Sequence, residues 1–167
     1  MKDNLILIGM PACGKSTIGV LLAKTAGKAF VDTDLLIQED QHALLQDIID
    51  RKGNTYFQQM ERQILTGIHP SNAVIATGGS AVYYEDAMTH LQKIGIIIYL
   101  KLSLASIEKR LNNIGTRGVL MSPGETLIDL YQRRTPLYEK YADITISADN
   151  LSTEQVVEET WAAYNIY

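Results

Sequence analysis

The sequence predicts one α/β domain, residues 1–167, built on a five-stranded parallel sheet with helices on both faces. Short apolar runs alternate with amphipathic stretches along the chain, which is typical of strands joined by helices. The apolar runs are continuous, as expected of strands that helices cover on both sides. The chain has 167 residues, of which 46% are hydrophobic, so it is long enough to bury one sizeable core.

The expected strands are the short apolar runs. The first runs into a glycine-containing turn at Gly9, the second ends at Asp32, and the third follows a turn predicted at residues 69–72. In chain order the five strands are Leu5–Ile8, Ala29–Val31, Ala73–Ala76, Ile94–Leu102 and Ile144–Ile146.

The expected helices are the amphipathic stretches between these runs. Phe57, Met60 and Ile64 recur at spacings of three and four residues, the period of a helix that buries one face. The predicted helices are Lys15–Thr25, Leu44–Ile49, Tyr56–Leu65, Glu85–Leu91, Leu104–Leu111, Thr126–Tyr141 and Thr153–Tyr164. Between Asn112 and Gly124 the periodicity disappears and glycines accumulate, which predicts a loop.

The charge and the cysteine content exclude several classes of protein. The formal net charge is −4, from 15 Lys and Arg against 19 Asp and Glu, so no basic excess indicates nucleic-acid binding. The longest later apolar run, Ile94–Leu100, is far shorter than the ~20 residues of a membrane-spanning helix. Cys13 is the only cysteine, which excludes a disulfide within the chain and is compatible with a reducing cytoplasm.

Residues Gly9 to Ser16 match the pattern of a phosphate-binding loop: Gly, four residues, Gly-Lys, then Ser or Thr. The loop follows an expected strand and opens an expected helix, so its backbone N–H groups and the helix N-terminus converge on one anion. Lys15 is expected to reach the β- and γ-phosphates of a nucleotide, and the Ser16 hydroxyl to ligate Mg²⁺. The motif therefore predicts ATP·Mg²⁺ binding.

Polar residues follow the second expected strand, where parallel sheets place their ligands. Asp32 and Asp34 lie on the same side if this segment is extended, because strand side chains alternate. One carboxylate would then hold Mg²⁺ through water and the other would orient or deprotonate an acceptor hydroxyl. The segment is equally well interpreted as the N-cap of a helix, where Asp and Thr are common.

Two further sets of residues suit the same chemistry. Thr77-Gly78-Gly79-Ser80 follows the third strand and either lets a ligand approach the backbone or forms a plain tight turn. Arginines neutralise charge in phosphoryl transfer, although most arginines in proteins are surface residues. The candidates are Arg110, Arg117, Arg133 and Arg134.

Together these motifs resemble the shikimate kinase family, the small kinases of aromatic amino-acid biosynthesis. The resemblance implies a three-layer P-loop kinase fold with a lid over Asn112–Gly124 and an acceptor-binding helical region around Asp34–Leu65. It covers nearly the whole chain. The matching residues, in order, are the loop continued into Thr17-Ile18-Gly19, Val31–Asp34, then Ile48, Gly53, Phe57 and Glu61, then Thr77–Val82, Arg117 and Arg133–Tyr138.

The resemblance also implies a role for each matching residue. Lys15 and Arg117 would stabilise the phosphoryl group in transfer, Ser16 and Asp32 would manage Mg²⁺, and Asp34 would bind the acceptor's hydroxyls and act as the base. The implied acceptor-binding residues are Asp34, Gln58, Gly78, Gly79, Ser80 and Arg134. The implied nucleotide contacts, with Arg110 packing on adenine, are Gly9, Pro11, Ala12, Cys13, Gly14, Lys15, Ser16, Thr17 and Arg110.

The chain departs from the family pattern at three positions. Ser80 replaces the third glycine of the turn, and Gly118 replaces the proline that follows the lid arginine; both changes are mild. Gln58 stands where the family has an arginine that binds the shikimate carboxylate, so a neutral donor replaces a cation. Arg62, one helical turn away, is a candidate substitute for that arginine.

These observations leave three hypotheses. The leading one is an ATP-dependent kinase that phosphorylates shikimate, acting as a cytoplasmic monomer without nucleic-acid or membrane partners. A kinase for a different hydroxylated acid or polyol is the second, favoured by Gln58. The third, a nucleotide-binding module without catalysis, does not explain the retention of Asp34 and Arg117.

Overall fold

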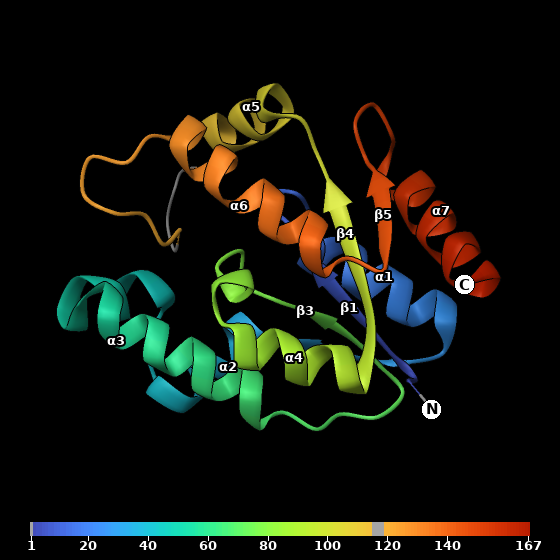
Figure 1. The fold of residues 1–167 in the computed structure, drawn as a ribbon, viewed down its shortest axis with the longest axis horizontal. Helices are drawn as coiled ribbons and strands as arrows, with labels where there is room; N and C mark the ends of the chain where they lie inside the picture. Colours follow the sequence, from blue (N-terminus) through green and yellow to red (C-terminus); the bar gives the residue numbers. More distant parts are fainter. Residues whose placement is uncertain (1, 115–118) are drawn as a thin grey trace.

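The computed structural model describes residues 2–114 and 119–167 (Figure 1). Its centre is a five-stranded parallel sheet with the order β2-β3-β1-β4-β5. The strands are β1 (Asn4–Ile8), β2 (Ala29–Asp32), β3 (Ala73–Ala76), β4 (Gly95–Lys101) and β5 (Ile144–Ser147). The predicted fold class and all five predicted strands are confirmed.

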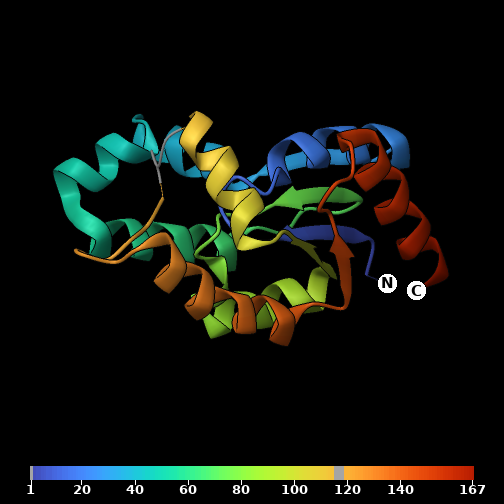
Figure 2. The same ribbon diagram turned by 90° about the horizontal axis from the view of Figure 1, so that it is seen from above.

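Helices cover both faces of the sheet. Viewed from above, α1 and α7 lie on one side, and α4 and α6 lie on the other (Figure 2). The helices are α1 (Lys15–Ala26), α2 (Thr33–Gln41), α3 (Leu45–Gly67), α4 (Glu85–Ile94), α5 (Leu104–Ile114), α6 (Leu127–Tyr141) and α7 (Thr153–Ile166), with a 3₁₀ turn η1 (Ala81–Tyr83). Among the residues described, none of these helices is long and apolar enough to cross a membrane.

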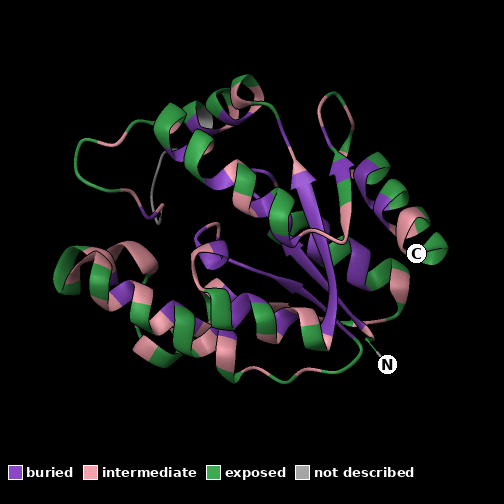
Figure 3. Ribbon diagram, viewed as in Figure 1, coloured by how far each residue is buried: buried purple, intermediate pink, exposed green. Residues whose placement is uncertain are grey.

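The core forms two clusters of different size. The central strands β1, β3 and β4 are almost wholly buried, which explains their continuous apolar sequences (Figure 3). A smaller cluster joins α2 and α3 to the segment after residue 118 through four buried residues. These are Ile37, Ile48, Phe57 and Leu120.

The structure corrects the sequence-based prediction at three places. The list of predicted helices lacks α2, although the N-cap interpretation of Asp32–Asp34 allows a helix there; its buried residues are Thr33 and Ile37, while Leu35 is exposed, so the sequence shows no clear apolar period. The two helices predicted over 44–65 are one element, α3, kinked at Gly53 with φ 81°. The predicted loop Asn112–Gly124 begins too early, because α5 continues to Ile114.

Asn4 fixes the ends of three strands near the start of the sheet. Its side chain, only 1% exposed, donates to the carbonyls of Pro70 and Ile94 at 2.8 and 2.9 Å and accepts from the Ala73 N–H at 2.9 Å. Ala73 begins β3, and Pro70 and Ile94 lie just before β3 and β4. The amide therefore sets the register of β1 between β3 and β4.

We predict that Asn4→Ala lowers the free energy of unfolding by roughly 2–4 kcal/mol, because three backbone groups lose a partner where water is excluded. Urea denaturation measures this change. Asn112→Ala, on the exposed surface of α5, is the matched control and should change stability by less than about 0.5 kcal/mol. Equal effects of the two substitutions would show that Asn4 has no special structural role.

Candidate active site

A cavity of about 370 Å³ opens where the phosphate loop, α2, α3, the turn after β3 and α6 meet. Several of these segments follow the carboxyl ends of parallel strands, the usual ligand site of such sheets. Most of the site residues predicted from the sequence line this one cavity. They are Pro11, Ala12, Gly14, Lys15, Ser16, Thr17, Asp34, Gly78, Gly79, Ser80 and Arg134.

The phosphate loop wraps around the side chain of Lys15. Lys15 Nζ donates to the carbonyls of Gly9 and Met10 at 2.8 and 2.9 Å, and lies 3.6 Å from the Sγ of buried Cys13. Gly14, the residue before α1, has φ 98°, a conformation that glycine adopts most easily. The loop thus places an ammonium group beside the N-terminus of α1, an arrangement suited to a phosphate chain.

Ser16 and Asp32 form a pair at the edge of this loop. Ser16 Oγ donates to Asp32 Oδ2 at 2.6 Å, and Asp32 Oδ1 accepts from the Asp34 N–H at 3.0 Å. Asp32 is therefore the N-cap of α2, and Asp34 stands in the first turn of that helix. Of the two interpretations of this segment, the helix N-cap is confirmed, because the cap hydrogen bond turns the chain into α2 directly after β2.

Asp34 lies beside a second carboxyl group, Glu61, which the sequence analysis did not assign to the site. Glu61 is fully buried; Oε2 accepts from Ser80 Oγ at 2.6 Å and from Tyr84 Oη at 2.8 Å, while Oε1 has no partner among the described residues. A Cβ on Gly78 would collide with Glu61 Oε1 and lie 3.0 Å from Asp34 Oδ1. The sequence signal that pointed to Glu61 was its place, with Ile48, Gly53 and Phe57, among the residues that match the family pattern.

The environment raises the pKa of both carboxyl groups. Burial raises the pKa of Asp34 to about 7, with further contributions from the nearby charges of Glu61 and Asp32, while Lys15 opposes the shift. Burial also raises the pKa of Glu61, against the hydrogen bonds from Ser80 and Tyr84. A carboxyl group that titrates near neutral pH is suited to exchanging a proton with an acceptor hydroxyl.

Arg134 of α6 supplies a second buried cation to the wall of the cavity. Its side chain is 1% exposed, its Nη2 donates to the Leu120 carbonyl at 2.8 Å, and its Nε donates to Tyr83 Oη at 3.0 Å. Burial opposes the charge, but the phenolic oxygens of Tyr138 and Tyr83 keep the pKa of Arg134 above its ordinary value. A Cβ on Gly79 would lie 2.8 Å from Arg134 Nη1, so this turn needs a glycine.

Some predicted residues lie outside the cavity. Gln58 lines an adjoining pocket together with Asn54, Tyr83 and Arg133, on the other side of Leu120. Arg110 Nη1 lies behind the phosphate loop, 3.2 Å from the Ala12 carbonyl and 3.3 Å from that of Cys13.

Three other positions named in the sequence analysis lie on the surface or outside the described residues. Arg62 pairs with Asp86 at 2.9 Å on the surface, so in this structure it does not substitute for the missing arginine at position 58. Arg117 and Gly118 lie outside the described residues.

A phosphate loop with its lysine, facing a carboxyl group and a buried arginine across one cavity, defines a P-loop kinase that acts on a small molecule. The comparisons with known proteins narrow this class. The family model described as shikimate kinase matches residues 11–165, and the chain therefore belongs to the shikimate kinase family.

Individual relatives agree with this assignment. The chain is 36% identical to a shikimate kinase from Sulfurihydrogenibium sp. over 157 residues, which cover 93% of this chain and 94% of the relative. A shikimate kinase from Acinetobacter baumannii, solved in complex with shikimate, superposes with a TM-score of 0.88 at 27% identity over 98% and 93% of the two chains. The Aquifex aeolicus shikimate kinase gives a TM-score of 0.82 at 27% identity, covering 97% and 96%.

We predict that Asp34→Asn stabilises the protein while abolishing most of its activity. The folded state raises the pKa of Asp34, so its charge opposes folding increasingly as the pH rises from about 4 to about 7, and fully above that. At pH 8 the substitution should raise the free energy of unfolding by roughly 2 kcal/mol. This is less than the pKa shift of Asp34 implies at about 1.36 kcal/mol per pKa unit, because water in the cavity screens the charge.

Urea unfolding at pH 8 and at pH 4.5 measures this gain, which should shrink at the lower pH. Asp40→Asn, on the exposed surface of the same helix, is the matched control and should change stability little at either pH. A destabilised Asp34→Asn variant at pH 8 would contradict the raised pKa.

Proposed function

We propose that this protein transfers the γ-phosphoryl group of ATP to a hydroxyl of shikimate, giving shikimate 3-phosphate in aromatic amino-acid biosynthesis. The observation that carries the proposal is the single cavity that holds Lys15, Asp34 and Arg134, one group for each part of such a reaction. Membership of the family supports it, as does the fold shared with a kinase solved in complex with shikimate.

At the phosphate end, Lys15 and the N–H groups of the loop would bind the β- and γ-phosphates. Lys15 now donates to two loop carbonyls, so its ammonium group is already held at the loop. Phosphoryl transfer depends mainly on positioning and on neutralising the charge of the transferred group. Lys15 supplies that charge from inside a fixed loop, and Arg117 is proposed to add a second cation.

Mg²⁺ fits the oxygen pair formed by Ser16 and Asp32. Among the described residues no group of three or more His, Cys, Asp and Glu side chains is placed to hold a metal ion. Mg²⁺ bound to a nucleotide needs only one or two protein oxygens, since phosphates and water supply the rest. We propose that Ser16 holds the ion directly and Asp32 through water, and that the ion neutralises phosphate charge.

At the acceptor end, Asp34 would bind the hydroxyls and take the proton of the attacking one. Its raised pKa favours this role, since a base works best when its pKa is near the working pH. Arg134 would bind the carboxylate of the acceptor, as a buried guanidinium beside the Gly79 turn. A nucleotide-binding module without catalysis would need neither group.

Gln58 favours a second candidate, a kinase for a different polyol or sugar acid. A neutral amide supplies about 1.4 kcal/mol less to a carboxylate than a charged donor, which is roughly tenfold in affinity. An ATP-consumption assay over shikimate, quinate and sugar acids decides between the two candidates. Shikimate should give the largest kcat/KM; a larger value for another acid would support the second candidate.

We also propose a cytoplasmic monomer that binds neither nucleic acid nor membrane. The single, buried Cys13 and the net charge of −4 support this proposal. Size-exclusion chromatography with light scattering tests the oligomeric state.

We predict that Lys15→Ala lowers kcat by a hundredfold or more, the scale for losing one key electrostatic stabiliser of a transition state. Steady-state kinetics with shikimate and ATP·Mg²⁺ measures the effect. Lys24→Ala, in the last turn of α1 and away from the loop, is the control and should retain wild-type kcat. Near-normal turnover of Lys15→Ala would refute the assignment of the phosphate loop.

We predict that Gln58→Arg lowers the KM for shikimate by roughly tenfold with little change in kcat, because carboxylate binding is remote from the reacting hydroxyl. Gln59→Arg adds the same charge one residue further along α3, on the exposed face, and should leave KM unchanged. If both variants behave alike, or if wild type already has a low KM that Gln58→Arg does not improve, position 58 does not control acceptor affinity.

A further inference from the structure

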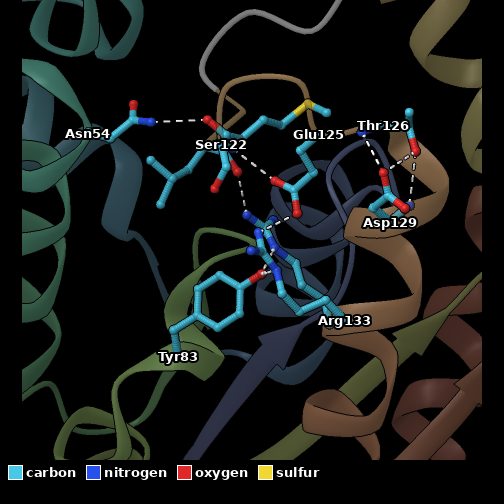
Figure 4. Close-up of polar contacts among 10 residues, drawn as sticks. Asn54, Tyr83, Ser122, Glu125, Thr126, Asp129 and Arg133 are labelled. Atoms are coloured by element: carbon cyan, nitrogen blue, oxygen red, sulfur yellow. Dashed lines mark hydrogen bonds and ion pairs between the residues drawn. The ribbon is translucent and has the colours of Figure 1, made fainter.

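Two neighbouring arginines of α6 converge on one hydroxyl group. Arg133 Nε and Arg134 Nε donate to Tyr83 Oη at 2.9 and 3.0 Å, and both guanidinium groups lie 5.2 Å from the centre of the Tyr83 ring (Figure 4). Consecutive residues of a helix project about 100° apart, so their side chains normally diverge. Tyr83, in η1 directly after the glycine turn, is the acceptor that brings them together.

Each of these arginines also holds the segment 119–125, here called the strap. Arg134 Nη2 donates to the Leu120 carbonyl at 2.8 Å, and Arg133 Nη2 pairs with Glu125 Oε1 at 2.6 Å. Glu125 in turn accepts from the Ser122 N–H at 2.9 Å (Figure 4). The strap is therefore attached at both ends to arginines that share Tyr83.

The strap and the cavity are in direct contact through Leu120. Leu120 lines the cavity and packs with Ile37, Ile48 and Phe57 in the smaller core cluster. Asn54 Nδ2 donates to the Met121 carbonyl at 3.0 Å, which ties the strap to α3 (Figure 4). A movement of the strap would therefore move Leu120, which forms part of the cavity wall.

Tyr83 also sets the orientation of Arg134. The Nε–H and Nη2 of Arg134 are directed to Tyr83 and Leu120, while Nη1 lies next to Gly79 at the cavity. An arginine offers its donors in a rigid planar fork, so fixing two of its nitrogens fixes the third. Without the Tyr83 hydroxyl, Nε would lose its partner in a buried place, and the orientation of the fork would be less tightly fixed.

We propose that Tyr83 is a positioning residue that orients Arg134 for the acceptor carboxylate and couples it, through Arg133 and Glu125, to the strap. The proposal rests on the proposed function, in which Arg134 binds that carboxylate. Tyr83 itself contacts no substrate. Its hydroxyl acts only through the two arginines.

The test is Tyr83→Phe, which removes the hydroxyl and keeps the ring stacked near the arginines. The KM for shikimate should rise about tenfold, the scale of one hydrogen bond to a charged group, with kcat and the KM for ATP within twofold of wild type. The KM for the methyl ester of shikimate, which has no carboxylate charge, should not change. A purely structural role for Tyr83 would raise both acceptor KM values together, and that result would overturn the proposal.

Tyr131→Phe is the matched control in α6. Its hydroxyl donates to the Leu102 carbonyl at 3.0 Å, so the variant loses one phenolic hydrogen bond without touching either arginine. It should leave the KM for shikimate at its wild-type value. A rise equal to that of Tyr83→Phe would also overturn the proposal.

The link to the strap has its own measurement. Glu125→Gln weakens the pair with Arg133, and if the contacts form one unit, the KM effects of Glu125→Gln and Tyr83→Phe should be less than additive. Hydrogen exchange of the amides of residues 120–125 should be faster in Tyr83→Phe than in wild type. Strictly additive effects with unchanged exchange would refute the coupling.

The outcomes separate this inference from the proposed function. Wild type that fails to phosphorylate shikimate would refute the proposed function, and the exchange of the strap amides would then decide whether Tyr83 holds the strap. Efficient wild-type turnover with an unchanged KM in Tyr83→Phe would refute the role of Tyr83 alone.

Discussion

The site depends on how closely the turn after β3 packs against its neighbours. At Gly78 a side chain would strike Glu61, and at Gly79 it would lie 2.8 Å from Arg134 Nη1 and 3.1 Å from Pro11 Cδ. Because this turn has no Cβ atoms, a carboxyl group, a guanidinium group and the phosphate loop can meet within one small cavity. Tyr138 Oη secures the arrangement by donating to the Gly79 carbonyl at 2.6 Å.

Although the chain has a net charge of −4, two of its cations are buried at the cavity. Lys15 and Arg134 are both buried, and each is surrounded by carbonyl or phenolic oxygens that stabilise its cation. Asp34 lines the same cavity with a pKa raised to about 7. The cavity can therefore attract a nucleotide and an anionic acceptor while retaining a group that exchanges a proton near neutral pH.

Two of the departures from the family pattern are better understood in the structure. Ser80 occupies a position where the family has a glycine. Its hydroxyl donates a hydrogen bond to the buried Glu61, and the Tyr84 hydroxyl donates a second one to the same carboxyl group. Two neutral donors thus surround Glu61, while Gln58 lies across Leu120 in another pocket. Among the described residues that line the cavity, Arg134 of α6 is the one arginine, and Ser80 donates a hydroxyl to Glu61.

The sequence by itself determined the five parallel strands and the phosphate loop, because continuous apolar runs and glycine spacings are local signals. The resemblance to the family added Asp34 and Arg134 as candidates, and the structure places both in one cavity with Lys15. The sequence left the start of α2 open between an extended segment and an N-cap, because the buried face of this helix is too small to show a period. The tertiary structure alone decided that Glu61 belongs to the site, that Arg62 pairs with Asp86, and that Tyr83 joins Arg133 and Arg134. Such contacts join residues from different elements, tens of positions apart in the chain, and only the packing of the elements brings them within hydrogen-bonding distance.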